Sequence, residues 1–383
     1  MSEAAEMRSA RAGMAALTAA GVTAGPIAGG CVVLLAKPFG GELGVPGEVI
    51  GYIATTALLC GCVTAAWGAR RSPGARWIGG YAVIAGAGWV AAGSSTHVGV
   101  FVTAVLVASL AAGPVLAAGY TLALRRGRGT LIGWHVAMWG GIAAMAGLAA
   151  RCDTAPGIGL RTTGIAAIVL GSLVAVLNGS VTQWNSVPDS RAERDAGGSW
   201  LLLIGYAGVG VGVGGTVLPA LHLLLFRWSA LDAEQAELLL VAALPAMVIA
   251  ALQAPALDAL PALLTLLAGG ALLVATAPGR ETVTIGLAVT LAAAARALRA
   301  LDAAEHARAP EAARARGIPI ALAVPGAGMA GLGLMVLLGR IAGTGTGLVL
   351  LAVPVLTAAL VCERLIRTPG TERTVPALGG EIP

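Results

Sequence analysis

The chain has 383 residues, of which 57% are hydrophobic and only 11% are charged. Charged residues make up about a quarter of an ordinary soluble protein, so this composition excludes a soluble globule and indicates a polytopic membrane protein. The net charge of +5 has no soluble basic domain to carry it, and we therefore expect no nucleic-acid partner.

Apolar segments long enough to cross a bilayer run through the whole chain. A spanning helix needs roughly 20 mostly apolar residues, because its backbone polar groups must all be bonded within the segment. By this criterion the sequence predicts an all-α integral membrane protein with twelve transmembrane helices. They are expected near residues 12–36, 47–67, 77–95, 98–124, 130–150, 162–184, 199–226, 236–253, 256–277, 281–299, 318–339 and 342–366.

The distribution of basic residues supports this count. With the N-terminus in the cytoplasm, about three quarters of the 24 Lys and Arg residues fall in cytoplasmic segments, as the positive-inside rule requires. We therefore expect a multi-pass protein of the inner (plasma) membrane, with the lipid bilayer as its surroundings and with both termini in the cytoplasm.

A polar segment in the middle of the chain divides the helices into two groups of six. We predict an N-terminal six-helix bundle at 1–184, a cytoplasmic linker at 185–198 and a C-terminal six-helix bundle at 199–383. Each half begins with a glycine-rich helix whose last residue is basic. An outer loop with acidic residues follows that helix. This weak internal similarity indicates two parallel repeats.

Twelve spans with a cytoplasmic linker after the sixth resemble the major facilitator superfamily of transporters. The sequence GCVTAAWGARR, between the second and third spans, places Gly61, Gly68, Arg70 and Arg71 at the positions of the family signature G-x-x-x-D-x-x-G-x-R-[RK]. The resemblance implies a gating role for these four residues. Ala65 replaces the signature Asp, which in the family helps to latch the two halves together.

The first span contains a cluster of helix breakers, GVTAGPIAGG at residues 21–30. It is similar to the glycine and proline motif that drug-exporting antiporters of the family carry in their fifth span. Pro26 removes the hydrogen bond to the carbonyl of Val22 and bends the helix, and Gly25 belongs to a row of glycines that gives a flat face. The cluster therefore marks either close helix packing or the wall of a substrate cavity.

Polar and aromatic residues inside the predicted spans are further candidates for a substrate site. His135 lies about two turns into the fifth span, beside Trp134 and one turn before Trp139, as suits a large apolar or cationic ligand. Tyr120 and Tyr206 are polar-tipped residues that also suit the lining of a central cavity. The alternatives are a histidine bonded to a neighbouring helix, tryptophans at the membrane interface, and buried tyrosines bonded to backbone carbonyls.

Acidic residues are expected only near the predicted membrane faces. This counts against strong proton coupling, which usually needs a titratable carboxylate or histidine inside the protein. Residues 296–317 are expected to continue the tenth span as a solvated helix with surface pairs such as Arg299 with Asp302, and are a possible docking site for a protein partner.

These features favour a transporter of the major facilitator type that exports a largely apolar or cationic small molecule by alternating access. One alternative is a non-transporting scaffold or accessory membrane subunit with the same fold. A second is an integral membrane enzyme acting on a lipid-like substrate, although we expect no enzymatic activity. No His, Cys or carboxylate pair has the spacing of metal ligands, and we expect no cofactor.

Overall fold

The computed structural model describes residues 3–71, 74–152, 154–177, 199–222, 233–308 and 323–367. Within these ranges the regular structure is helical throughout. The first span consists of three helical segments in succession, followed by a short helix in the loop that leads to the second span. They are α1 (Glu3–Val22), the π-helix η1 (Thr23–Ile27), α2 (Ala28–Leu34) and α3 (Ala36–Leu43).

Eleven further long helices follow, and together with the first span they confirm the prediction of twelve. The first half continues with α4 (Gly47–Arg71), α5 (Ala75–Gly93), α6 (Val98–Arg126), α7 (Arg128–Arg151) and α8 (Pro156–Leu177). The second half contains α9 (Ser199–His222), α10 (Ala233–Ala251), η4 (Leu257–Ala259), α11 (Leu260–Ala275), α12 (Arg280–Arg308), α14 (Ala323–Ala342) and α15 (Thr344–Arg367). In the described part of the chain, nine of these helical segments are by themselves long and apolar enough to cross a membrane.

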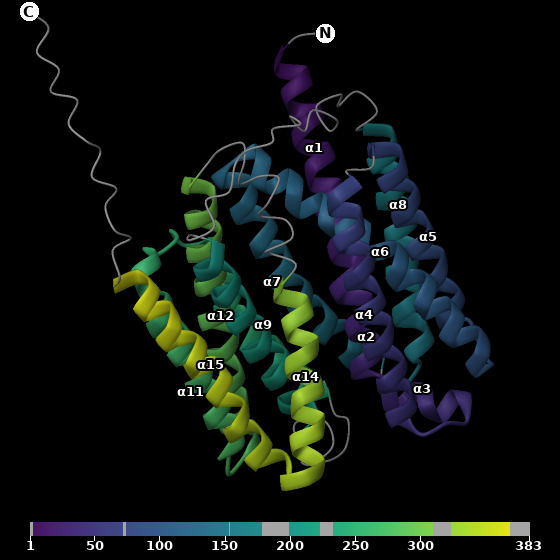
Figure 1. Ribbon diagram of the computed structural model, residues 1–383. Coiled ribbons are helices and arrows are strands. Elements are labelled where there is room, and N and C mark those ends of the chain that lie inside the picture. The colour runs from purple at the N-terminus through teal and green to yellow at the C-terminus, as the bar shows by residue number, and fades with distance from the viewer. Residues whose placement is uncertain are drawn as a thin grey trace, which may run out of the picture.

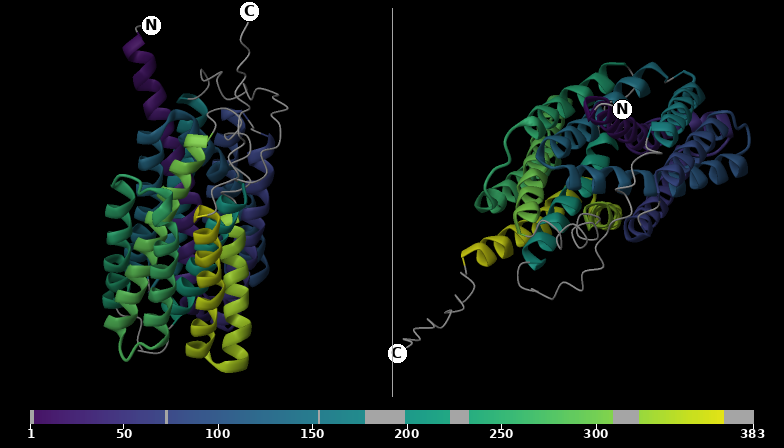
Figure 2. Two further views of the ribbon diagram at one scale, coloured as in Figure 1. Left: turned by 60° about the vertical axis from the view of Figure 1, so that its left-hand side comes forward. Right: turned by 90° about the horizontal axis from the view of Figure 1, so that it is seen from above.

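The twelve helices form two six-helix bundles, which lie side by side in Figures 1 and 2. In the first bundle α5 packs against α6 and α8, and α4 packs against α6. The equivalent pairs six spans later, α11 with α12 and α15 and α10 with α12, also pack together in the second bundle. The predicted internal repeat is therefore visible in the packing as well as in the sequence.

Two helix pairs make the main contacts between the bundles. They are α7 with α10, which are the fifth and eighth spans, and α4 with α14, which are the second and eleventh. A shift of six spans exchanges one pair with the other, so the choice of helices follows the two-fold relation expected of parallel repeats, although α7 packs much more extensively on α10 than α4 does on α14.

The first described helix begins, and the last described helix ends, at the same end of the bundles. α1 begins and α15 ends at the upper end in Figure 1, which we call the terminal end. The prediction that this end faces the cytoplasm stays a prediction. The boundaries proposed for the two domains also stay predictions, because the linker at 185–198 lies outside the described residues.

Glycines allow the helices of the first bundle to approach each other closely. A methyl group added at Gly86 of α5 would lie 2.5 Å from the carbonyl oxygen of Gly164 of α8, and one at Gly79 would lie 2.7 Å from that of Gly171. Because lipid chains are as apolar as the side chains, helices in a membrane associate largely through such close packing. This accounts for part of the high glycine content, 56 residues.

Candidate functional site

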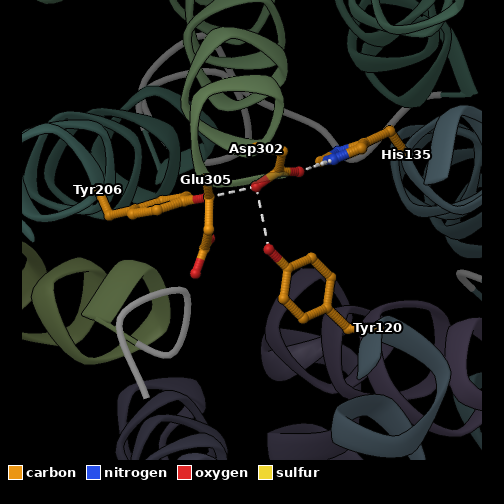
Figure 3. A network of polar contacts seen from close by, with 5 residues as sticks. All are labelled: Tyr120, His135, Tyr206, Asp302 and Glu305. Atoms are coloured by element: carbon orange, nitrogen blue, oxygen red, sulfur yellow. Dashed lines mark hydrogen bonds and ion pairs between the residues drawn. The ribbon is translucent and has the colours of Figure 1, made fainter. Parts of the chain in front are cut away.

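Five polar side chains meet where the two bundles face each other (Figure 3). Tyr120 of α6 and His135 of α7 come from the first bundle, and Tyr206 of α9 with Asp302 and Glu305 of α12 come from the second. We call these five residues the inter-bundle cluster. They belong to four helices, two from each half of the chain.

Four of the five members of the inter-bundle cluster lie at a similar depth, and Glu305 lies one turn nearer the terminal end. Tyr120 and Asp302 are each six residues before the last residue of α6 and α12, and His135 and Tyr206 are each seven residues after the first residue of α7 and α9. At a rise of about 1.5 Å per residue, this places all four about 10 Å inside the terminal end of their helices.

Asp302 is the centre of the inter-bundle cluster. The hydroxyl of Tyr120 donates a hydrogen bond of 2.9 Å to Asp302 Oδ1, and the hydroxyl of Tyr206 bonds to the same oxygen. Nε2 of His135 bonds to the other oxygen, Oδ2. The Tyr206 hydroxyl also lies 3.0 Å from Glu305 Oε2. Asp302 thus joins two helices of the first bundle to two helices of the second.

The carboxyl groups of the inter-bundle cluster are out of contact with solvent. Asp302 is 1% exposed and Glu305 is 4% exposed, and Arg299, one turn earlier on α12, is 1% exposed. A buried charge is costly unless it is paired and hydrogen-bonded, and the three donors around Asp302 meet that requirement. Glu305 Oε1 and Arg299 Nε, in contrast, have no hydrogen-bond partner among the described residues.

The expectation of a solvated helix over residues 296–317 is wrong for the part that the structure describes. Arg299, Asp302 and Glu305 are buried, because α12 continues as a 29-residue helix that packs against α9, α10 and α11 beyond the apolar part of its sequence. Asp302 therefore pairs with side chains from other helices. Residues 309–317 lie outside the described residues, and the proposed docking of a protein partner there stays untested.

Asp302 and Glu305 lie near the terminal end of α12, where acids were expected, but both are buried. Sequence spacing at i, i+3 is the same for a surface ion pair and for a buried polar face, so Arg299 and Asp302 gave no signal of burial. The other helices did offer a sequence signal. Tyr120, His135 and Tyr206 are polar groups inside apolar segments, and such groups need hydrogen-bond partners when they are buried. The acids of α12 are suitable partners for them.

Of the predicted substrate residues, Tyr120, His135 and Tyr206 come together in the inter-bundle cluster, whereas both tryptophans pack into apolar surroundings. The ring of Trp134 fills the space left by Gly119 of α6, where an added methyl group would lie 2.4 Å from Cζ3. Trp139 is 7% exposed and lies in the main apolar core. No contact tests whether these residues also bind a ligand, so that role stays a prediction.

Gly25 and Pro26 lie in the π-helical turn of the first span. The turn packs closely on α6, since a methyl group at Gly25 would lie 2.7 Å from Cδ1 of Leu116. Nε1 of Trp89, on α5, donates a hydrogen bond of 2.8 Å to the carbonyl oxygen of Ala24. π-helical turns are rare and often occur at functional sites. Here the predicted break is present, and a side chain from a neighbouring helix bonds one of its carbonyl groups.

The glycines of the gating signature pack inside the first bundle. A methyl group at Gly61 would lie 3.0 Å from the carbonyl oxygen of Ser109, and one at Gly68 would lie 3.0 Å from Cα of Pro114. Both contacts join α4 to α6 and do not cross between the bundles. The side chains of Arg70 and Arg71 are not among those described, and the gating role of all four residues stays a prediction.

The inter-bundle cluster joins an aspartate, a glutamate, a histidine and two tyrosines through polar contacts. Within the described ranges, no group of three or more His, Cys, Asp or Glu side chains is arranged to hold a metal ion. Its chemistry is therefore that of a hydrogen-bonded acid, histidine and tyrosine network.

Comparisons with known proteins identify the fold. No family model matches the sequence, and no curated protein sequence matches it either. Solved structures match along almost the whole chain. The human organic anion transporter MFSD10 (TETRAN) has a TM-score of 0.65 and 14% identity, covering 92% of this chain and 99% of that one.

Two further structures agree with this result. The proton:xylose symporter XylE of the major facilitator superfamily, bound to 6-bromo-6-deoxy-D-glucose, has a TM-score of 0.67 and 12% identity over 92% of this chain and 95% of that one. A bacterial homolog of the human lysosomal transporter Spinster, inward-facing and occupied, has a TM-score of 0.65 and 14% identity over 95% and 98%. The protein therefore has the fold of the major facilitator transporters, with two six-helix bundles in the membrane.

Proposed function

We propose that the protein is a membrane transporter in which the two bundles rock against each other and expose a substrate site to each side in turn. The inter-bundle cluster is the contact that holds the terminal end closed. The observation that carries this proposal is the placement of Asp302, whose hydrogen-bond donors include Tyr120 and His135 of the opposite bundle.

A polar contact of this kind suits a reversible closure. While the bundles are together, each buried group depends on its partner, because an unpaired buried charge costs several kcal/mol. When the bundles separate, water can take the place of each partner. The contact therefore fixes one arrangement of the bundles without making that arrangement permanent.

The cargo that we propose is a largely apolar or cationic small molecule, moved in the direction of export. Apart from the inter-bundle cluster and Arg299, the buried polar residues in the described part of the chain are only Ser and Thr: Ser109, Thr163, Thr216, Thr284 and Thr290. Such an interior suits an apolar cargo. The two carboxyl groups of the cluster suit a positive charge on that cargo.

Dye movement in liposomes tests this proposal. The purified full-length chain is reconstituted, and the release of ethidium, an aromatic cation, is compared with the release of fluorescein, an organic anion. We expect ethidium to leave faster than from protein-free liposomes. Asp302→Asn should slow that release by about tenfold, the effect of losing about 1.4 kcal/mol from the closed state.

A carboxylate outside the inter-bundle cluster provides the control. Asp258→Asn removes an exposed carboxylate from η4 and should leave the rate unchanged. Release of both dyes at the protein-free rate, with a folded protein, would contradict the transport proposal and favour the non-transporting scaffold. Selective release of fluorescein would contradict the proposed charge of the cargo and keep the transport function.

A further inference from the structure

The inter-bundle cluster contains one hydrogen-bond contact more than its hydroxyl and imidazole protons can fill. Two carboxyl oxygens lie against the single hydroxyl of Tyr206: Oδ1 of Asp302, and Oε2 of Glu305 at 3.0 Å. A tyrosine hydroxyl has one proton to donate, and an ionised carboxylate can only accept. For each contact to have a proton of its own, one of the two carboxyl groups must carry a proton and donate it to Tyr206.

The surroundings of the two acids decide which of them carries the proton. Asp302 receives Tyr120, Tyr206 and His135, and a carboxylate surrounded by several donors is stabilised in its ionised form. Glu305 makes only the contact to Tyr206, and its Oε1 has no hydrogen-bond partner among the described residues. We propose that Glu305 is a proton-binding site, whose proton is donated to Tyr206, which in turn donates its own proton to Asp302.

The charges of the neighbouring groups agree with this assignment. Among the described residues, Asp302 is the carboxyl group beside Glu305, with Tyr120, His135 and Tyr206 as its partners. Arg299 lies one turn earlier on α12, close enough to Arg128 of α7 and Arg296 of α12 for their charges to act on it. An ionised Glu305 would place a second negative charge beside Asp302, and two neighbouring carboxylates repel each other.

This assignment deepens the transport proposal and rests on it for its role in the cycle. Removing the proton leaves two carboxylates against one hydroxyl, and contact with water relieves that arrangement. Water reaches the cluster when the two bundles part at the terminal end. Release of the proton from Glu305 therefore favours an open terminal end, and binding of the proton favours a closed one.

Infrared spectroscopy of the protein in lipid nanodiscs tests the assignment without requiring transport. At about pH 7 an ordinary glutamate, with a pKa of about 4.3, is ionised and shows no carboxylic acid C=O band. We expect such a band in the wild-type protein and its loss in Glu305→Gln, whose amide can still donate to Tyr206 and so supports folding. Glu363→Gln, which removes a carboxylate paired with an exposed arginine on α15, should retain the band.

Three results would overturn the assignment: no band in the wild type, a band that survives Glu305→Gln in folded protein, or a band lost in Asp302→Asn but kept in Glu305→Gln. The last would place the proton on Asp302. A protein that shows the band but releases no dye would refute the transport proposal and leave the proton site standing. A protein that releases ethidium without showing the band would remove the proton site alone.

Discussion

His135 and Asp302 form an ionisable pair across the bundle interface, although they are 167 residues apart in the sequence. The imidazole approaches Oδ2 of Asp302 from α7, on the side opposite to the two tyrosines, which share Oδ1. The contacts of Asp302 with His135 and Tyr120 therefore cross between the bundles, whereas its contact with Tyr206 lies within the second bundle.

The first prediction concerns pH. A higher pH favours release of the proton proposed on Glu305, which leaves a second carboxylate beside Asp302. Two carboxylates repel each other, so the contact weakens, and the terminal end should open when the pH is raised from about 5 to about 8. Spin labels at Gly129 and Trp200, which are exposed on α7 and α9, should move apart.

A variant of Glu305 tests whether its proton causes this shift. The labels require Cys60 and Cys62 to be replaced by alanine, because the other three cysteines are buried. Glu305→Gln should make the label distance insensitive to pH. A label distance that stays the same between pH 5 and pH 8 in the wild type would refute the pH-dependent contact.

The second prediction concerns the hydroxyl of Tyr120. Tyr120→Phe leaves Asp302 with two donors in place of three and should weaken the contact between the bundles by about 1 kcal/mol. The distribution of label distances at low pH should extend toward the longer distances of the open state. Tyr81→Phe, on α5 and outside the inter-bundle cluster, should leave the distance unchanged. Equal effects of the two variants would show that the change acts on general packing.

The third prediction concerns the π-helical turn. Trp89→Phe keeps an aromatic ring on α5 but removes the indole donor to the carbonyl of Ala24 in the protein interior. The expected cost is about 1 kcal/mol of stability. It is measured as a lower melting temperature in detergent.

Trp77→Phe is the matched control, because Trp77 lies on the same helix and is 71% exposed. Its melting temperature should stay at the wild-type value. If Trp89→Phe melts at the wild-type temperature as well, the indole hydrogen bond does not stabilise the turn.

The fourth prediction concerns helix packing. Gly86→Ala places a methyl group 2.5 Å from the carbonyl oxygen of Gly164, so α5 and α8 must separate, at a cost of about 1 to 3 kcal/mol. Gly80→Ala is made on the same helix, where nothing lies within 4 Å of the added atom. Because alanine is the better helix former by about 1 kcal/mol, Gly80→Ala should hold or raise the melting temperature. A lower value for Gly80→Ala than for Gly86→Ala would contradict the packing account.

The arrangement of helices could be predicted from the sequence because hydropathy reports directly on which segments can enter a membrane. The break between the eighth and ninth spans at QAPALDALP, for example, appears between Ala251 and Leu260. The candidate site could be predicted only in part. Tyr120, His135 and Tyr206 stood out as polar groups inside apolar segments, whereas Asp302 and Glu305 lay beyond the apolar part of their span.

The difference has a physical cause. Hydropathy measures whether a segment suits lipid, but a helix longer than the bilayer can be buried by its neighbours at any height. α12 has 29 residues, about 44 Å at the usual rise, against a hydrocarbon thickness of about 30 Å. Its charged end therefore looks like a solvated extension until the positions of α6, α7 and α9 are known.

The equal lengths of α6 and α12 have a consequence for how the two halves differ. Both helices have 29 residues, they are the fourth and tenth spans, and Tyr120 and Asp302 occupy the same place in each, 22 residues after the first. Positions related in this way face each other across the pseudo-symmetry axis. Two aspartates there would repel, whereas a phenol and a carboxylate attract. The two halves are therefore complementary at this point: the first supplies a hydrogen-bond donor and the second supplies the acceptor. Neither half could take the place of the other.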